Sequence, residues 1–366
     1  MSINRIMLYV LLLLMAAPLR SSLHSLEKGD QMPHFRLKGI DGKFYNSQNF
    51  PSRLLAVVFI SNHCPVSQNF QEELLALVED YEARGVGLIA ISPNDPQAIP
   101  PDELAFSDLG DSLAEMKIRA KDFKYTFPYL YDGSTQDTSR AFGVRVTPHA
   151  YLFDAKRSLR YSGRIGDPKN PSNSNRQELR QAIEALIGGN SPKVEQSPVF
   201  GSSIKWKKNR YLVQKMNERF SRETIVLKNA DKRTYEFIRK NVSLRPKVIY
   251  VWSSKDTNYR EDLLKISAMH KIYRKRGLEL ITSCIDGVDE HENIYDILKN
   301  TLCSSQNYIS EGAEISPLAD LRGESGDRIT PYLAILDHKG LPVYRSRGGI
   351  NELVIKKEVL KTLNRK

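Results

Sequence analysis

The sequence predicts an α/β protein made of two tandem domains of one fold, each with a mixed central sheet flanked by helices. Its 366 residues are enough for two separate cores. A strand–helix–strand pattern occurs twice at a spacing of 192 residues, and both copies continue into the same strand–turn–strand pattern. With 40% hydrophobic and 27% charged residues, the composition is globular and excludes a disordered or collagen-like chain.

The first 25 residues are read separately from the fold. Arg5 precedes an apolar run over residues 6–17, and Pro18 and polar residues follow it. This layout is typical of a secretory signal peptide, and the run of twelve residues is short for a membrane span. Because no small-residue cleavage site follows, an uncleaved membrane anchor remains the alternative. Either way we expect the protein to be secreted or periplasmic.

Each copy of the repeat begins with a buried strand, an amphipathic helix, a glycine stop and a second buried strand. AVVFISNH at 56–63 aligns with VIYVWSSK at 248–255, and Gly85 aligns with Gly277. Apolar runs separated by a helical period and closed by glycine indicate a βαβ unit. In the first copy we expect one helix over about residues 65–84.

The second part of each copy is marked by a Thr-Pro pair. Pro148 follows Thr147, Pro331 follows Thr330, and an Asp stands six residues after each proline. The apolar residues on both sides of that Asp predict a strand, a hairpin turn and a second strand.

These repeats set the expected domain boundaries. We predict a first domain over 26–190, a linker over 191–210 where glycine and proline interrupt the periodicity, and a second domain over 211–366.

Residues 1–199 contain 22 basic and 22 acidic residues, so the formal net charge of +11 lies wholly after residue 199. An acidic partner for the second domain is therefore conceivable. However, its basic residues alternate with acidic ones, which favours a solvated face over a nucleic-acid site.

A βαβ unit followed by a Thr-Pro hairpin is the thioredoxin arrangement. Residues 54–206 resemble the peroxiredoxin-like (AhpC/TSA, redoxin) subgroup of the thioredoxin-like superfamily in the stretches VVFISNHCP, ISPNDP, FPYLYD, AFGVRVTPHAYLFD, LRYSGRI and FGSSIKWK. The second copy is similar, more distantly, to extracytoplasmic thiol-disulfide reductases in VWSSKDTNYRED and RITPYLAILD. The resemblance implies an antioxidant or thiol-exchange oxidoreductase without a cofactor. Its partners would be an external thiol reductant, a substrate protein or a peroxide.

Cys64 is the residue expected to carry the chemistry. It follows the strand AVVFI and stands at the predicted helix start. A thiol there interacts with the positive end of the helix dipole and with free backbone N–H groups, which favours the thiolate. His63 can add positive charge when protonated. The alternative is a buried, inert cysteine, which is the commonest fate of a lone thiol.

Departures from the family pattern limit the possible reactions. Relatives carry Cys-Asn-His-Cys where this sequence has Ser61, and in the thioredoxin register the second thiol position is Ser67. Ser202 replaces a further family cysteine. A single thiol can reduce a peroxide with Ser61 hydrogen-bonding the peroxide, or it can exchange disulfides with external thiols. A third possibility is no turnover.

The substrate is expected to bind beside Pro148. The resemblance implies that this proline is cis and faces the thiol, and that Thr147 offers backbone groups to an extended substrate chain, with Ser67 adjoining.

The second domain lacks the thiols. Its two equivalent positions hold Asp256, expected as a helix N-cap, and Tyr259. Pairing of Cys284 with Cys303 is left open, and no Cys/His pair has the spacing of a zinc site. Asn241 lies in a glycosylation sequon that also arises by chance.

The alternative to an enzyme is a catalytically inactive tandem thioredoxin-fold module that binds a partner protein.

Overall fold

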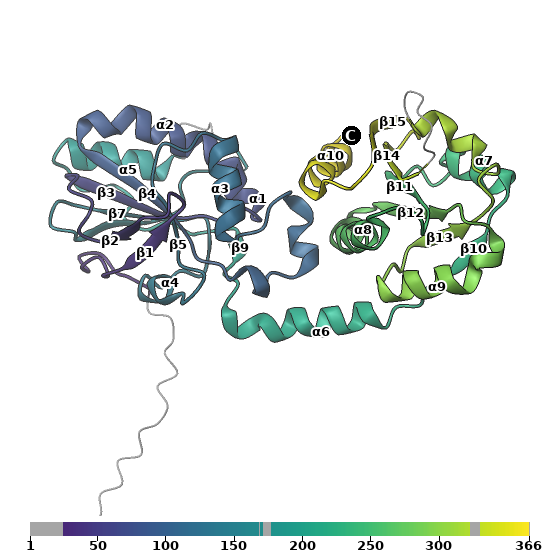
Figure 1. Cartoon of the computed structure of the whole chain (residues 1–366). Coiled ribbons are helices and arrows are strands. Elements are labelled where there is room, and N and C mark those ends of the chain that lie inside the picture. The colour runs from purple at the N-terminus through teal and green to yellow at the C-terminus, as the bar shows by residue number, and fades with distance from the viewer. Residues whose placement is uncertain (1–24, 168, 171–176, 323–329, 366) are drawn as a thin grey trace, which may run out of the picture.

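The computed structural model describes residues 25–167, 169–170, 177–322 and 330–365. Two large sheets and a separate two-stranded pair make up its strands, and helices pack on both large sheets (Figure 1). The predicted fold class, α/β with two tandem domains, is confirmed. Apart from Ser25, the predicted signal or anchor segment lies outside the described residues. Within these ranges no helix is both long enough and apolar enough to cross a membrane.

The first sheet contains seven strands. In spatial order they are β2 (Phe44–Asn46), β1 (Arg36–Gly39), β5 (Tyr129–Tyr131), β4 (Val86–Ser92), β3 (Leu54–Phe59), β7 (His149–Phe153) and β8 (Leu159–Gly163). The three central strands β5, β4 and β3 run parallel, and the strands on either side of them are antiparallel. β3 is buried at every position, as expected for a strand covered on both faces.

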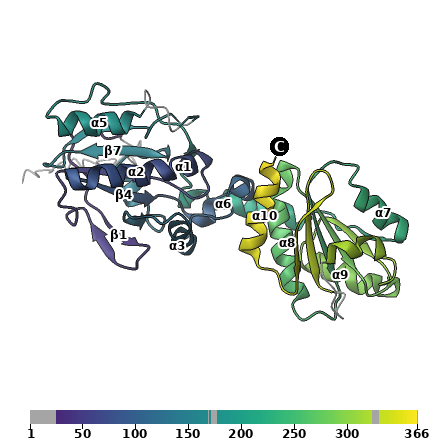
Figure 2. The same ribbon diagram turned by 90° about the horizontal axis from the view of Figure 1, so that it is seen from above.

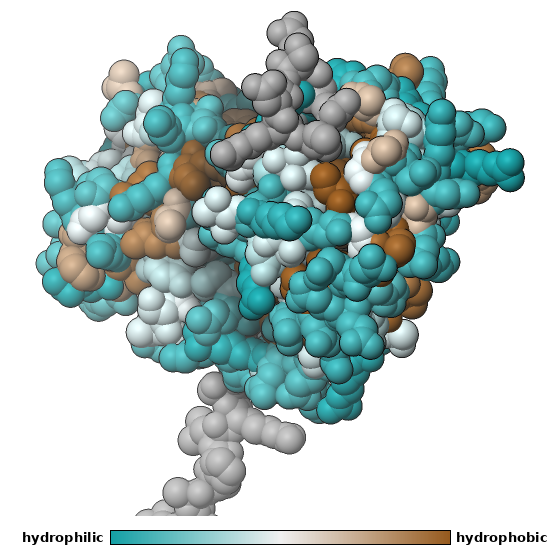
Figure 3. Space-filling model, turned by 45° about the vertical axis from the view of Figure 1, so that its right-hand side comes forward, coloured by the Kyte–Doolittle hydropathy of each residue, from teal (hydrophilic) through white to brown (hydrophobic). Residues whose placement is uncertain are grey.

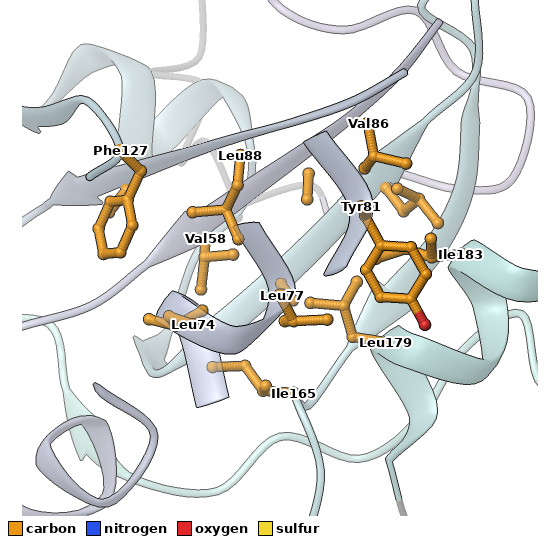
Figure 4. Close-up of a cluster of buried hydrophobic side chains, with 14 of the residues drawn as sticks. Val58, Leu74, Leu77, Tyr81, Val86, Leu88, Phe127, Ile165, Leu179 and Ile183 are labelled. Carbon is orange, nitrogen blue, oxygen red and sulfur yellow. The ribbon is translucent and has the colours of Figure 1, made fainter. Parts of the chain in front are cut away.

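Helices α2 (Gln71–Tyr81), α3 (Leu113–Asp122) and α5 (Glu178–Ile187) cover one face of this sheet. Figure 4 shows Leu74 and Leu77 from α2 and Leu179 and Ile183 from α5 gathered around Val58 of β3. The other face is covered by residues around α4 (Asp137–Ala141) and by the segment leading into β1. Because both faces of the sheet are buried, the C-terminal end of β3 is held in place. Cys64 comes shortly after that end in the chain.

The single helix predicted over residues 65–84 is wrong. The chain forms α1 (Pro65–Asn69), leaves helical geometry at Phe70 and then forms α2 and a short 3-10 turn, Glu82–Arg84. The Phe70 ring is buried in the same core cluster as the α2 side chains Leu74 and Leu77. The predicted glycine stop is correct, because Gly85 ends the 3-10 turn with a φ of 80°.

The second sheet contains six strands. They are β10 (Leu227–Asn229), β13 (Gln306–Ile309), β12 (Glu279–Cys284), β11 (Lys247–Trp252), β14 (Tyr332–Leu336) and β15 (Pro342–Arg347). β11, β12 and β13 are parallel, and β14 and β15 form an antiparallel hairpin, which repeats the arrangement of β3, β4, β5, β7 and β8. The edge differs, since β10 is parallel to its neighbour whereas β1 is antiparallel. The helices are α7 (Lys232–Lys240), α8 (Tyr259–Tyr273), α9 (His291–Asn300) and α10 (Glu352–Asn364).

The predicted linker over 191–210 contains part of the first folded unit. Its strand β9 (Ser202–Ser203) pairs with β6 (Val146–Thr147), and Ile204 is buried in the first core. The connection between the two sheets is instead α6 (Arg210–Ser221), which has no buried residue and runs between the two halves (Figure 1). We therefore propose to place the domain boundary at α6.

The two halves also meet directly. The 3-10 segment Pro101–Phe106, which lies between β4 and α3 of the first half, packs on α8. Figures 1 and 2 both show α8 and α10 on the side of the second half that faces the first. The face seen in Figure 3 is mostly hydrophilic, with apolar residues in small separate groups.

The sequon at Asn241 is not available for glycosylation in this fold. The Asn241 side chain is buried, and its amide donates to the carbonyls of Arg245, Asp337 and His338. Its role is therefore to hold the turn between β14 and β15.

Candidate functional site

Cys64 lies between β3 and α1, as the sequence predicts. Its backbone is extended and it is the N-cap residue, with Pro65 at the first helical position. The side chain is 0% exposed, and Sγ donates to the Thr147 carbonyl oxygen at 3.1 Å. The thiol therefore faces the Thr-Pro strand but is covered in this conformation, not open to solvent.

The prolines of both Thr-Pro pairs are cis. The Thr147–Pro148 and Thr330–Pro331 peptide bonds are both cis, which confirms the prediction for Pro148. Each lies at the same place in its domain, directly before the strand that pairs antiparallel with the central strand.

Ser61 and Ser67 surround the thiol without hydrogen-bonding to it. The Ser61 hydroxyl bonds to the Thr147 hydroxyl at 2.7 Å, and the Ser61 N–H donates to Ser67 Oγ at 3.3 Å. In the described residues no hydrogen bond joins Ser61 to Cys64. The hydroxyl expected to align a peroxide is therefore engaged with Thr147.

His63 is tied to a carboxylate that the sequence pattern did not single out. Its ring Nδ1 lies 2.6 Å from Asp111 Oδ2, and both side chains are buried. Nε2 of His63 is also buried, and within the described part of the chain it has no hydrogen-bond partner. His63 therefore presents one fixed nitrogen and one free nitrogen in the loop before Cys64.

Asp111 fixes the whole loop. Its Oδ1 accepts from the N–H of Asn62 at 2.6 Å and of His63 at 3.3 Å, and its Oδ2 also accepts from Asn94 at 2.7 Å. Burial alone would raise the pKa of Asp111, but the facing His63 and these hydrogen bonds hold it below its ordinary value. Asn94 belongs to the ISPNDP stretch, which was the one sequence signal for this cluster.

The edge expected to receive a substrate chain is occupied by the protein itself. β9 pairs antiparallel with β6, with Thr147 opposite Ser202. Gly201 allows this approach, since a Cβ there would lie 1.8 Å from the Thr147 carbonyl oxygen. The expectation that Thr147 offers a free backbone edge is therefore wrong for this conformation.

The segment after β9 is held firmly. Lys205 donates its N–H to Asn94 Oδ1 and accepts at its carbonyl from Asp95 and Gln136. By contrast, Phe200 just before β9 is 69% exposed. Buried hydrogen bonds thus hold the segment after β9, whereas the side chain just before β9 is exposed to solvent.

The equivalent site in the second domain carries a carboxylate. Asp256 accepts from the N–H of Ser253 at 2.8 Å and from the Thr330 hydroxyl at 3.0 Å. It is not the N-cap that the sequence predicts, because Asn258 holds that place before α8. Asp256 instead closes the turn before the helix and faces the cis-proline strand, as Cys64 does. A cavity of about 770 Å³ opens beside it, lined also by Asp286.

The two remaining thiols are structural. Cys284 and Cys303 are free and buried, so the disulfide left open by the sequence is not formed. Burial raises the pKa of both, that of Cys303 to about 11. Neither is therefore a good nucleophile near neutral pH. Among the residues the structure describes, no three His, Cys, Asp or Glu side chains are grouped to hold a metal ion.

Residues 28–162 match the AhpC/TSA family model. This stretch, and not the whole chain, is therefore similar to redoxin-type domains of the thioredoxin-like superfamily. No curated protein matches the chain.

Several solved structures are similar to parts of this chain. A hypothetical protein from Sinorhizobium meliloti 1021 is 32% identical, covers 50% of this chain and 97% of its own, and has a TM-score of 0.44. An uncharacterized conserved protein from Geobacillus kaustophilus is 35% identical, covers 50% and 93%, and also scores 0.44. The thioredoxin domain of a thiol-disulfide oxidoreductase from Bacteroides vulgatus is 14% identical, covers 37% and 86%, and scores 0.31.

Proposed function

We propose that this protein is a thiol-disulfide oxidoreductase that uses Cys64 as its single reacting sulfur. The observation that supports this most is the pairing of β9 with the strand that contacts the thiol. Cys64 Sγ lies 3.1 Å from the Thr147 carbonyl, and Ser202 lies opposite Thr147 as a residue of an extended substrate would. A protein substrate that presents a disulfide would take the place of β9 on this strand edge, beside the thiol.

The reaction needs only one thiol of the chain. The Cys64 thiolate attacks one sulfur of an external disulfide, a new S–S bond forms, and the other sulfur leaves as a thiolate with the bonding electron pair. A second, external thiolate then attacks the mixed disulfide, takes the substrate sulfur and releases Cys64 as a thiolate. Because Ser67 and Ser202 stand where relatives carry cysteines, the external thiol cannot be replaced by an internal one.

Disulfide exchange is favoured over peroxide reduction by the position of Ser61. A peroxide needs a hydroxyl aligned with the sulfur, whereas Ser61 is bonded to Thr147 and makes no hydrogen bond to Cys64 among the described residues. Thr147 in turn holds the thiol through its carbonyl. In this arrangement Ser61 orients the binding strand and takes no direct part in the reaction.

We also propose that the protein acts outside the cytoplasm. Support comes from the layout of residues 1–25, in which a basic residue precedes a short apolar run and a polar stretch.

The test uses a Cys284→Ser, Cys303→Ser protein, in which Cys64 is the only sulfur nucleophile. It is treated in parallel with oxidised glutathione and with hydrogen peroxide plus a sulfenic-acid trap, and the products are identified by mass spectrometry. We expect a single glutathione adduct at Cys64 that reduced thiol removes, and little trapped sulfenic acid. The further variant Cys64→Ser should give neither product. A trapped sulfenic acid without a glutathione adduct would instead establish one-Cys peroxidase chemistry.

A non-catalytic binding module is the second candidate, and the complete burial of Cys64 favours it. The carboxylate at the second site supports the same view, since a domain without a thiol can still hold a partner. If folded protein forms no adduct with either reagent while the unfolded protein does, this candidate replaces the oxidoreductase.

A further inference from the structure

We infer that the second domain positions the Cys64 loop, acting through a bridging segment formed by residues 101–111. Tyr273 and Ser107 are assigned as its positioning residues. This inference rests on the proposed function of Cys64 and gives the thiol-free second domain a part in it.

The second domain holds the bridging segment from one side. Tyr273, at the end of α8, donates its hydroxyl to the Ser107 carbonyl at 2.8 Å, and Arg276 donates to the Ala105 carbonyl at 2.8 Å. The Arg276 guanidinium also lies 4.7 Å from the centre of the Phe106 ring. Ala105 is buried within the hydrophobic core of the second domain. The two hydrogen bonds are buried or partly buried, so they are less weakened by solvent than an exposed ion pair would be.

The other side of the segment holds the loop before Cys64. Ser107 Oγ donates to the Asn62 carbonyl at 3.0 Å, and the Asn62 side-chain amide donates to the Gly110 carbonyl at 2.7 Å. Asp111, at the end of the segment, accepts from the N–H groups of Asn62 and His63 and binds the His63 ring. Residues 107–111 thus make most of the hydrogen bonds that reach Asn62 and His63 from outside their own strand and helix, and Tyr129 of β5 adds a longer one to Asn62 Oδ1 at 3.4 Å.

Ser107 is the residue at which the two sides meet. Its carbonyl takes the Tyr273 hydroxyl, while its own hydroxyl donates to Asn62, two residues before the thiol. Arg119 and the Leu109 N–H both donate to Ser107 Oγ, which leaves its proton for Asn62. Burial raises the pKa of Tyr273, so its hydroxyl stays protonated as the donor. Loss of the Tyr273 hydroxyl takes this donor from the buried Ser107 carbonyl. Loss of the Ser107 hydroxyl takes the acceptor from the Leu109 N–H and leaves the Asn62 carbonyl with its bond from Gln68 alone.

The experiment measures the rate of disulfide exchange at Cys64 against pH in the full chain with Cys284→Ser and Cys303→Ser. The variants are Tyr273→Phe, Ser107→Ala and the combination of both. Tyr235→Phe is the matched control, because its buried hydroxyl bonds to Ser283 and Ser310 within the second domain and does not touch the bridging segment. Oxidised glutathione is the probe, and thermal unfolding is recorded for each variant.

We expect Tyr273→Phe and Ser107→Ala each to change the exchange rate by about fivefold and to move the pH at which it is half-maximal. The double variant should equal the single ones, because both act along one path. Tyr235→Phe should lose similar stability and leave the pH profile unchanged. If Tyr273→Phe matches Tyr235→Phe in rate and profile while the parent protein is reactive, the positioning role is refuted and the proposed function stands. A parent protein that does not react at Cys64 refutes the proposed function itself.

Discussion

Thr147 organises the site at the level of single residues. Its carbonyl accepts from Cys64, its hydroxyl bonds to Ser61, and its backbone pairs with Ser202. The sequence could place Cys64 and the cis proline, because a strand end, a helix start and a Thr-Pro pair are local patterns. It could not place Asp111, since the bond to His63 spans 48 residues and leaves no local trace.

His149, next to the cis proline, makes folding sensitive to acid. Burial lowers its pKa from 6.5 to about 4, and among the described residues its ring nitrogens bond to Ser162 and Tyr151. The unfolded chain therefore takes a proton near pH 6.5, whereas the folded chain does so only near pH 4. The contribution of His149 to the free energy of unfolding is fully present above pH 6.5. About 3 kcal/mol of it is lost as the pH falls to 4.

Replacing this group should flatten that pH dependence. We expect His149→Asn to be less stable than the parent protein at pH 7 but to lose less free energy of unfolding between pH 6.5 and pH 4 in urea titrations. His270 is half-buried, and desolvation also lowers its pKa to about 4, so part of the dependence should remain. His34→Asn, at an exposed position, serves as the control. Parallel curves for His149→Asn and the parent would show that His149 is not the titrating group.

At the scale of elements, β9 pairs with the strand that contacts the thiol, and we expect it to limit access to Cys64. The sequence predicted the central strands and the helix that follows the first of them in each copy, because a buried strand and an amphipathic helix each have a period that spans many residues. β9 has only two residues, too few to show a hydrophobic period, so it fell within the predicted linker. The break at Phe70 was missed for a related reason, since an apolar residue fits a helical pattern whether or not its backbone is helical.

Loosening β9 should expose Cys64. We expect Gly201→Ala to raise the rate of iodoacetamide alkylation of Cys64 by roughly tenfold in the Cys284→Ser, Cys303→Ser protein, because the added methyl group cannot fit against the Thr147 carbonyl. Gly189→Ala is the control, since that glycine also has a positive φ but nothing within 4 Å of the added carbon. Equal rates in the two variants would mean that β9 does not limit access.

At the scale of the whole molecule, two copies of one fold have divided their roles. The first keeps a thiol beside its cis proline, and the second keeps the proline but presents Asp256 in place of the sulfur. The repeat was visible in the sequence because the strands and glycine stops recur at one offset of 192 residues, and a Thr-Pro pair follows them in both copies. The contact of the bridging segment with α8 was not, because packing between domains depends on single side chains such as Tyr273 and Arg276.

The most direct measurement compares the rate constant for disulfide exchange of Cys64 with oxidised glutathione in the folded chain and in the same chain unfolded in urea. Cys284→Ser and Cys303→Ser are present in both samples. A thiol that the fold prepares for reaction should exchange faster in the folded chain, despite its cover. A buried structural cysteine reacts only when the protein opens, so a folded rate far below the unfolded one would contradict the assignment of Cys64 as the reacting sulfur.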